Sequence, residues 1–346
     1  MNILVTGATG FVGSHIVRML LADGHRVRVL RRESSSTKML ASLTSASESR
    51  AAGSGLAGLS VESAIGDVTD RNSVFAAVEG CKIVFHAAGV VSFWRGLRKI
   101  QRGVNVDGTR HVVEACLAHK VERLIHTSSI AAIGFASGGQ VGDEALEYNW
   151  SPYRIHYNDT KHLAELEVHQ GIKRGLDAVI VNPAVVFGPG DLNLNAGAMV
   201  FQMARSKIPF YFPGGCTVCD VEDVARGHIL AFEKGKCSER YILGGDHYTW
   251  KDLLTLIAQV VGVPPPQRQI PTWALSVVAQ GYDLFSRLKK KEPPATPESI
   301  RVSSIPAYYS SDKAIRELGY KISPFRETVK KTYEWYAANG YLRRSL

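Results

Sequence analysis

The stretch ILVTGATGFVG at residues 3–13 decides how this chain folds. Its first three residues are apolar, which is typical of a strand buried on both faces of a parallel sheet. A glycine-rich turn follows, and the amphipathic stretch at residues 11–21 predicts a helix directly after it. In such a unit Gly7 permits a tight turn, Gly10 lets backbone approach a pyrophosphate, and Gly13 lets the helix pack closely on the strand.

The predicted strand, turn and helix together favour a bound dinucleotide. The N-terminus of a helix presents N–H groups without partners inside the helix, and the positive end of its dipole, and both attract a pyrophosphate. A glycine-rich turn without a ligand is the alternative, and the flanking strand and helix weigh against it. The turn residues that we expect to contact the dinucleotide are Gly7, Thr9, Gly10, Phe11, Val12 and Gly13.

The composition of the 346 residues fits one large α/β unit or two closely joined ones, since 45% are hydrophobic. No apolar run approaches the ~20 residues that cross a bilayer, and no charged leader precedes the motif, so we expect a cytoplasmic protein. Five cysteines without a disulfide-like framework agree with a reducing compartment. The net charge of +9 comes mostly from scattered basic residues, so we expect no nucleic-acid partner.

The residues after the second predicted strand, 27–30, indicate which dinucleotide binds. An acidic residue there would bind a ribose 2′-hydroxyl, whereas arginine accommodates a 2′-phosphate. This chain has Arg31 and Arg32, so we predict NADP, with NAD as the alternative. Asp67, followed by Val68, is placed to accept a hydrogen bond from the adenine amino group, although it could instead cap the helix that follows.

Further buried strands are predicted at 61–64, 83–86 and 123–127, and a helix at 105–119. The strand at 83–86 runs into small residues that leave room for backbone against the cofactor. These small residues are Ala87, Ala88 and Gly89.

Tyr157 and Lys161 lie four residues apart in a predicted helix that continues to about Lys173, so their side chains share one face. A phenol has an ordinary pKa of ~10, and a nearby ammonium and a positively charged nicotinamide would favour the phenolate, so we expect a lowered pKa. Tyr309 and Lys313 have the same spacing. Only Tyr157 follows a serine at the carboxyl end of a predicted parallel strand, where open α/β sheets bind ligands, so we predict that Tyr309 is structural.

A set of motifs spread along the chain resembles the extended short-chain dehydrogenase/reductase family of NAD-dependent epimerases and dehydratases. Within that family the chain is most similar to the branch of dihydroflavonol 4-reductases and 3β-hydroxysteroid dehydrogenases. The serine-rich segment at 33–60 departs from the family pattern. The motifs that carry the resemblance are residues 6–13, 66–67, 86–89, 127–129, 157–161, 182–191, 221–225 and 313–319.

The resemblance implies a doubly wound parallel sheet, a Rossmann fold, with a smaller C-terminal part that binds substrate. It also implies that Ser129 polarises the substrate oxygen, that Tyr157 is the acid/base, and that Lys161 orients the ribose and lowers the pKa of the phenol. Pro183 is implied to lie beside the nicotinamide. The residues that the resemblance adds to the cofactor contacts are Thr127, Tyr157, Lys161, Pro183 and Val185.

The expected domain organisation follows from the same pattern. Residues 1–182 form the dinucleotide-binding domain, and a strand and helix within 218–247 return to it. Residues 183–217 and 248–346 form the substrate-binding part. The serine-rich segment 33–60 has few core-forming residues, so we expect a flexible surface insertion.

The function predicted from the sequence is NADP-dependent reduction of a ketone or aldehyde of a fairly apolar small molecule, or oxidation of the alcohol. The alternatives are a nucleotide-sugar epimerase or dehydratase with tightly bound NAD, and a non-catalytic redox sensor that binds the dinucleotide. The residues that we expect to contact the substrate are Phe93, Trp94, Phe135, His156 and Phe187.

Three further features affect expectations about partners. Cys216 and Cys219 resemble half of a zinc site, but no second pair has suitable spacing, so we expect two ordinary thiols and no metal. The apolar segment 273–288, before three lysines, is more typical of a helix that covers a substrate pocket than of one that lies on a membrane. A homodimer is expected through the helices near 105–119 and 155–173.

Overall fold

The computed structural model describes residues 1–37, 40, 61–289, 291–293 and 295–343. Apart from residues 33–37 and 40, the segment expected to be a flexible insertion lies outside the described residues.

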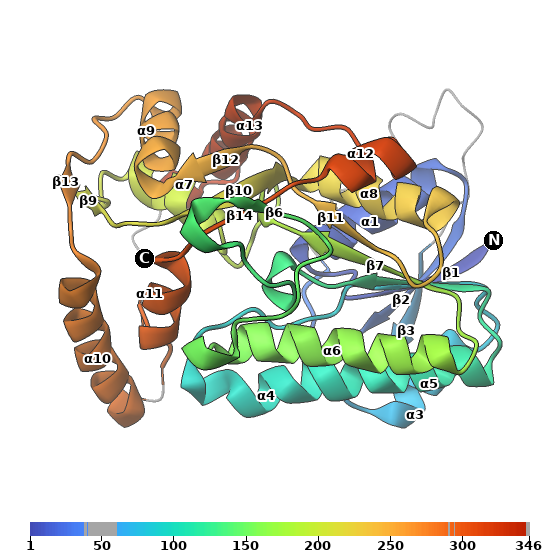
Figure 1. Cartoon of the computed structure of the whole chain (residues 1–346). Helices are drawn as coiled ribbons and strands as arrows, with labels where there is room; N and C mark the ends of the chain where they lie inside the picture. Colours follow the sequence, from blue (N-terminus) through green and yellow to red (C-terminus); the bar gives the residue numbers. More distant parts are fainter. Residues whose placement is uncertain (38–39, 41–60, 290, 294, 344–346) are drawn as a thin grey trace, which may run out of the picture.

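A seven-stranded sheet forms the centre of the molecule, and every pairing in it is parallel (Figure 1). From β1 the chain continues to one side, through β2 and β3, and then crosses to β4 on the other side. An open α/β sheet binds its ligand outside the carboxyl ends of the strands at such a reversal. In order across the sheet, the strands are β11 (Arg240–Leu243), β7 (Ala178–Pro183), β5 (Arg123–Thr127), β4 (Ile83–His86), β1 (Asn2–Thr6), β2 (Arg26–Arg31) and β3 (Val61–Ile65).

Helices cover both faces of this sheet, which confirms the predicted doubly wound fold. In β1, Ile3 and Val5 pack into the core on one face, and Leu4 packs into the core on the other, as alternating strand side chains must. The helices on the first face are α1 (Phe11–Ala22), α8 (Val221–Lys234) and α12 (Asp312–Leu318); those on the second are α3 (Arg71–Val78), α5 (Gly108–Ala118) and α6 (His156–Lys173).

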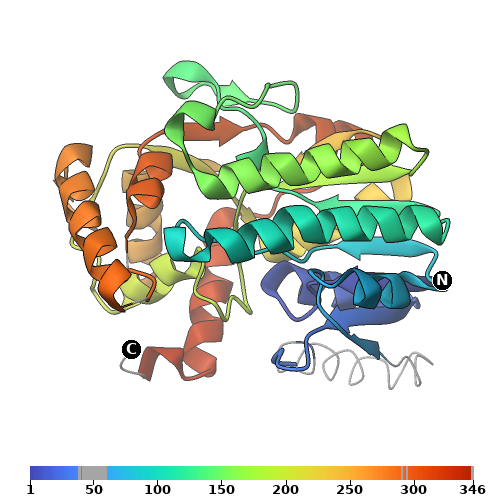
Figure 2. The same cartoon turned by 90° about the horizontal axis from the view of Figure 1, so that it is seen from below.

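The helix expected at 105–119 begins earlier than its sequence pattern indicates. Helix α4 (Arg98–Arg102) runs through a π-helical turn, η2 (Gly103–Asp107), into α5. This helical run lies beside α6 in both views of the molecule (Figures 1 and 2). Asn105 lies in the π-turn, a feature that is frequent at functional sites.

The rest of the chain forms a second part beside the carboxyl edge of the main sheet. Its core is built around Phe187, Val218, Leu253 and Phe325. Its strands are β6 (Val141–Gly142), β8 (Val185–Phe187), β9 (Phe210–Tyr211), β10 (Gly215–Asp220), β12 (His247–Thr249), β13 (Arg268–Gln269) and β14 (Pro306–Tyr309). Its helices are α7 (Gly197–Ala204), α9 (Trp250–Val261), α10 (Thr272–Lys289), α11 (Pro297–Ser303) and α13 (Phe325–Ala338).

The segment that returns to the main sheet is narrower than the expected 218–247. Strand β11 and helix α8 pack with the main sheet, but β10 pairs with β8, β12 and β14 in the second part. No helix among the described residues is long and apolar enough to cross a membrane.

Candidate active site

The glycine turn after β1 is packed against two other segments. Gly7 has φ +69°, and a Cβ added there would lie 2.5 Å from the carbonyl carbon of Ala87. A Cβ at Gly13 would lie 2.2 Å from the Gly7 carbonyl oxygen, so α1 begins directly against the turn. A Cβ at Gly10 would meet the same oxygen at 3.1 Å and, among the described residues, nothing else within 4 Å. Gly10 therefore faces open space at the reversal between β1 and β4.

The N-terminus of α1 is suited to an anionic group. Gly10 is its N-cap, no side chain in the described chain caps it, and its first turn holds no acidic residue. By contrast, the side chains of Asp220 and Thr249 cap α8 and α9. The first N–H groups of α1 thus lack a side-chain acceptor, and pyrophosphate oxygens can supply it. The turn therefore fits a dinucleotide.

The two arginines expected at the adenosine end lie at the carboxyl end of β2, with Arg31 as its last residue and Arg32 next. Arg31 Nε donates to the Ser63 hydroxyl on β3 at 3.3 Å. Arg32 follows it and is exposed. Both guanidinium groups are thus on the side of the reversal where the adenosine of a dinucleotide bound at Gly10 would lie.

Asp67 does not cap the helix that follows it, which was the alternative role that the sequence left open. Its carboxylate accepts hydrogen bonds from the backbone N–H and the hydroxyl of Thr69, both at 2.9 Å. The cap of α3 is Asp70. Val68 is buried in the core against α5, so its backbone is the part that could contact adenine.

A buried histidine supports the small residues after β4. The Nδ1 atom of His86 hydrogen-bonds the hydroxyl of Thr6 at 2.7 Å, and its Nε2 atom hydrogen-bonds that of Thr109 at 3.0 Å. The Thr6 hydroxyl also accepts the Ala88 N–H at 3.3 Å. Burial lowers the pKa of His86 to about 3, so the ring is neutral and acts as a fixed hydrogen-bonding strut. The side chain of Asn105 in turn bonds the backbone of residue 90, just beyond Gly89.

Ser129, Tyr157 and Lys161 come together at the carboxyl end of β5. Ser129 is the first residue of the turn after Thr127 and Ser128, and its hydroxyl accepts the Ala131 N–H at 3.1 Å. Tyr157 and Lys161 are one turn apart on α6. The Lys161 ammonium donates to the carbonyl oxygen of Thr127 at 2.8 Å, which anchors α6 to the end of β5.

The pKa of Tyr157 differs from the sequence-based expectation. Burial raises the pKa of this phenol, and its hydrogen bond with Ser129 only partly opposes the rise. Burial also lowers the pKa of Lys161 to about 8, with Glu165 opposing the fall. The expected lowering of the phenol pKa includes the charge of a bound nicotinamide; in the cofactor-free protein the pKa is raised instead, because burial outweighs the hydrogen bond with Ser129.

Glu165 and Asn182 are two supporting residues that sequence reasoning missed. The side-chain amide of Asn182 donates to the Glu165 carboxylate at 2.7 Å and to the Ser129 carbonyl oxygen at 2.9 Å. Glu165 is 2% exposed and lies one turn beyond Lys161 on the same face of α6. The i,i+4 spacing of Lys161 and Glu165 was visible in the sequence, but nothing in the sequence indicated that Asn182 on β7 would bond Glu165.

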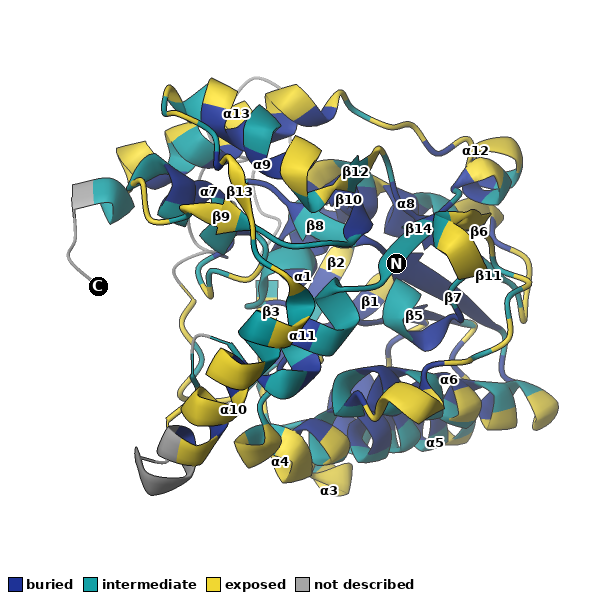
Figure 3. Cartoon of the chain, turned by 60° about the vertical axis from the view of Figure 1, so that its left-hand side comes forward, coloured by how far each residue is buried: buried dark blue, intermediate teal, exposed yellow. Residues whose placement is uncertain are grey.

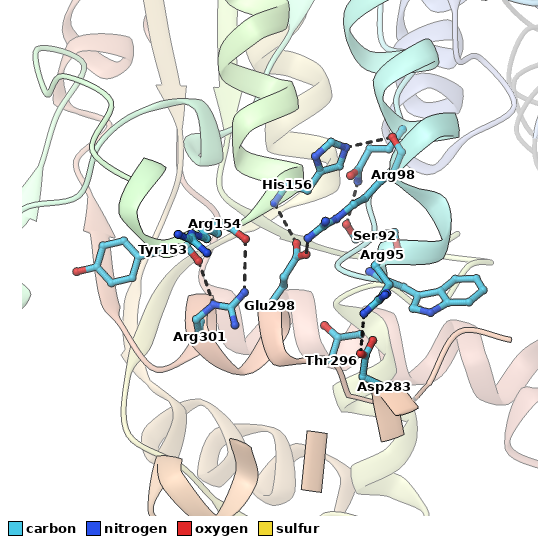
Figure 4. Close-up of polar contacts among 12 residues, drawn as sticks. Ser92, Arg95, Arg98, Tyr153, Arg154, His156, Asp283, Thr296, Glu298 and Arg301 are labelled. Atoms are coloured by element: carbon cyan, nitrogen blue, oxygen red, sulfur yellow. Dashed lines mark hydrogen bonds and ion pairs between the residues drawn. The ribbon is translucent and has the colours of Figure 1, made fainter. Parts of the chain in front are cut away.

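The start of α6 is held by α11 of the second part (Figure 4). Glu298 accepts the backbone N–H of His156 at 2.9 Å and forms an ion pair with Arg98 on α4. A carboxylate at a helix N-terminus is stabilised by the helix dipole. This contact fixes the first turn of α6, which carries Tyr157, and sequence reasoning gave no indication of it.

The residues expected to contact substrate lie in different surroundings, and one of them packs directly on Tyr157. The ring of Phe93 packs edge-on against Tyr157, with centroids 5.6 Å apart. Trp94 next to it hydrogen-bonds Ser286 on α10, and the ring nitrogen of His156 bonds the carbonyl oxygen of Arg98. Phe135 packs on Trp150 and lines an open hollow of about 630 Å³ beside Tyr153.

Phe187 does not contact substrate, contrary to expectation. It is fully buried in the core of the second part, where its ring packs against Phe325 with centroids 5.1 Å apart. Pro183 ends β7 beside Leu243, and Val185 begins β8 two residues later. Both lie at the carboxyl edge of the main sheet.

Two residue pairs singled out in the sequence, a Tyr–Lys pair and a Cys–Cys pair, lie outside the candidate active site. Tyr309 lies in strand β14 and Lys313 in helix α12, so their four-residue spacing does not place them on one helix face. Tyr309 is 1% exposed and packs in a small core with Ile133 and Ile242. Cys216 and Cys219 are buried on opposite faces of β10, in different cores.

The chain matches known proteins over nearly its whole length. The sequence model of the NAD dependent epimerase/dehydratase family matches residues 3–244. A protein of Synechocystis sp. with the provisional name dihydroflavonol 4-reductase is 31% identical over 344 residues, which are 98% of this chain and 95% of that protein. The sterol demethylase protein B of Methylococcus capsulatus is 32% identical over 349 residues, which are 99% of this chain and 100% of that protein.

A solved structure shows the same architecture. The crystal structure of gox2253 is 36% identical, has a TM-score of 0.82, and covers 98% of both chains. The family match spans the glycine turn, Ser129, Tyr157 and Lys161, and the geometry of the turn fits the dinucleotide that such enzymes use. The chain therefore belongs to the NAD-dependent epimerase/dehydratase family, the extended short-chain dehydrogenases/reductases, and is an NAD(P)-dependent enzyme.

Proposed function

We propose that this enzyme is an NADP-dependent oxidoreductase that reduces a ketone or aldehyde of a fairly apolar small molecule, or oxidises the alcohol. The observation that carries the proposal is the arrangement of Ser129, Tyr157 and Lys161 at the carboxyl edge of the sheet, with the ring of Phe93 packed on Tyr157. The positions of Arg31 and Arg32 support NADP. The sterol and flavonol named for the relatives support a ring-bearing apolar substrate.

Ser129, Tyr157 and Lys161 have different roles in the proposed reaction. A bound nicotinamide supplies or accepts the hydride. In the reducing direction the Tyr157 hydroxyl donates its proton to the substrate oxygen, and the Ser129 hydroxyl polarises that oxygen. The raised pKa of Tyr157 keeps the phenol protonated near neutral pH, which suits this donation. Lys161 would hydrogen-bond the ribose of the bound cofactor, and it holds α6 against the end of β5.

The test is NADPH oxidation with a panel of ketones and aldehydes, including sterol and flavonoid ketones. Tyr157→Phe keeps the ring but removes the transferable proton, so turnover should fall by ~10²–10⁴-fold while NADPH affinity changes little. Tyr309→Phe is the matched control and should leave turnover nearly unchanged, because Tyr309 lies in a separate core.

Two results would contradict the proposal. Full turnover by Tyr157→Phe on a substrate of the wild type would exclude the proton transfer. Binding of NADPH without reduction of any compound in the panel would favour the epimerase or sensor alternatives, and release of NAD from the purified protein on denaturation would separate these two.

A further inference from the structure

Helix α10 carries more exposed large apolar residues than any other described helix in the second part. Its most exposed apolar residues are Trp273 at 72%, Val277 at 64% and Leu284 at 63%. Val278 and Tyr282, farther around the helix, are 54% and 42% exposed. Figure 3 shows α10 at the outside of the molecule with much of its outer surface exposed. Trp273, Val277 and Leu284 share one side of the helix by their spacing, and exposed apolar surface of this kind marks an interaction site.

The polarity of α10 is the reverse of an ordinary surface helix. Its buried positions include Asp283, which pairs with Arg95, and Ser286, which accepts a hydrogen bond from the Trp94 indole (Figure 4 shows the ion pair). A helix that faces water turns its apolar residues inward and its polar residues outward. The polar contacts thus hold α10 to the molecule with its apolar side turned away from the protein.

Exposed cations flank this helix along the chain. Residues 272–282 contain no charged side chain. Arg268 precedes the helix and Lys291 follows it, and both are exposed. Arg95 and Arg98, which attach α10 and α11 to the rest of the molecule, keep 46% and 50% of their side-chain surface exposed.

We propose that α10 binds the surface of an anionic lipid bilayer, with its apolar side at the boundary between head groups and acyl chains. An outward apolar side flanked by arginine and lysine is the pattern of an interfacial helix. The exposure of its outer side favours the membrane alternative for this segment over a helix that only covers a substrate pocket. A second copy of the chain fits less well. A two-fold contact through α10 would bring the cations that flank the helix in one copy near those of the other copy, and like charges repel.

The surface lies next to the candidate active site. Trp94, bonded to α10, adjoins Phe93, whose ring packs on Tyr157. A bilayer bound at the outer side of α10 would therefore lie one helix away from the segment that lines the site. If the proposed function holds, an apolar substrate could reach Tyr157 from the lipid; the binding surface itself does not depend on that function.

The test is flotation of the purified full-length protein with vesicles of phosphatidylglycerol and phosphatidylcholine in equal parts, and with vesicles of phosphatidylcholine alone. We expect the protein to float with the anionic vesicles, more weakly as salt screens the charges, and not with the neutral ones. Val277→Glu and Leu284→Glu, alone and combined, should lower the bound fraction roughly ten-fold or more. Arg268→Gln with Lys291→Gln should weaken binding in low salt.

Ile315→Glu is the matched control, since Ile315 is a 43% exposed apolar residue on α12, and it should bind like the wild type. NADPH affinity and the melting temperature of every variant should stay unchanged, which separates this test from that of the catalytic function. The proposal is overturned if the wild type does not float with anionic vesicles in low salt, or if Leu284→Glu floats equally well. It is also overturned if light scattering without lipid shows a wild-type oligomer that Leu284→Glu dissociates, because a second copy would then cover α10.

Discussion

Burial moves the pKa values of Tyr157 and Lys161 in opposite directions, upward for the phenol and downward for the ammonium. Both shifts favour the neutral form of each group. In the cofactor-free protein the proton therefore stays on the tyrosine. Alcohol oxidation needs the phenolate, so that direction depends on the positive charge of the oxidised nicotinamide more than carbonyl reduction does.

The lowered pKa of Lys161 predicts how cofactor affinity depends on pH. The ammonium loses its proton as the pH rises through about 8, and with it the charge-assisted hydrogen bonds that it donates. Calorimetry between about pH 7 and pH 9.5 should show NADPH affinity falling across that value, by up to ~1.5–3 kcal/mol. Lys161→Met should bind more weakly and without this dependence; the same slope in both proteins would exclude Lys161 as its source.

The same group affects the stability of the cofactor-free fold with the opposite sign. An unfolded lysine keeps its ordinary pKa of 10.5, so between about pH 8 and pH 10.5 the unfolded chain binds the proton that the folded chain has lost. Over that window the contribution of Lys161 to the free energy of unfolding rises with pH.

The arginines at the end of β2 predict a preference for NADPH over NADH. Arg32→Ala should reduce that preference most and Arg31→Ala next, because the Arg31 guanidinium is already bonded to Ser63. Each lost contact with a 2′-phosphate should cost about 1.5–3 kcal/mol of NADPH binding, measured by calorimetry. Arg26→Ala, an exposed position at the other end of β2, is the control. Equal affinity of the wild type for NADPH and NADH would contradict the prediction that these arginines bind a 2′-phosphate.

Among the elements, α6 connects the two parts of the molecule. It carries Tyr157 and Lys161, Glu165 on its inner face supports Asn182, and its first turn receives Glu298 from α11. The position of the phenol thus depends on contacts of α6 with two other segments, β7 and the distant α11.

Removing the carboxylate at the start of α6 should lower activity more than stability. Glu298→Ala should reduce turnover on the order of ten-fold, since small misplacements of a catalytic group are costly, while the helix loses ~0.3–2 kcal/mol. Glu298→Gln should recover part of the loss. Asp252→Ala removes an acidic residue from the first turn of α9 and should leave turnover unchanged. A fall in melting temperature that accounts for the whole activity loss would argue against a positioning role.

At the scale of the whole molecule, the glycine turn links stability to cofactor binding. Gly13 and Gly7 have no room for a Cβ, whereas Gly10 faces open space in the cofactor-free fold. The first two glycines therefore serve folding, and Gly10 serves the ligand.

Thermal melting should separate these roles. NADPH at about 100 times its Kd should raise the free energy of unfolding of the wild type by about 2.7 kcal/mol. Gly10→Ala should leave the melting temperature of the cofactor-free protein close to that of the wild type but greatly reduce the NADPH-induced rise. Gly13→Ala should lower the melting temperature even without cofactor. An undiminished NADPH effect in Gly10→Ala would show that the pyrophosphate binds elsewhere.

The sequence by itself determined the parts of this protein that depend on neighbouring residues. The apolar run at 3–5, the glycine turn and the helix after it were readable because strand, turn and helix each have a local pattern. The shared face of Tyr157 and Lys161 followed from helical spacing. The parallel, doubly wound sheet was implied by the family resemblance that these motifs carry, and the structure confirms it.

Only the tertiary structure decided what depends on contacts between distant segments. Phe187 is an aromatic residue of the kind that lines apolar pockets, but in the fold it packs against Phe325 inside a core. Glu298 lies 142 residues from the helix that it caps. Helix α10 has an apolar side in any fold, and the contacts of Asp283 and Ser286 turn that side outward. Which side of an element is covered depends on its neighbours in space, and a one-dimensional pattern does not contain them.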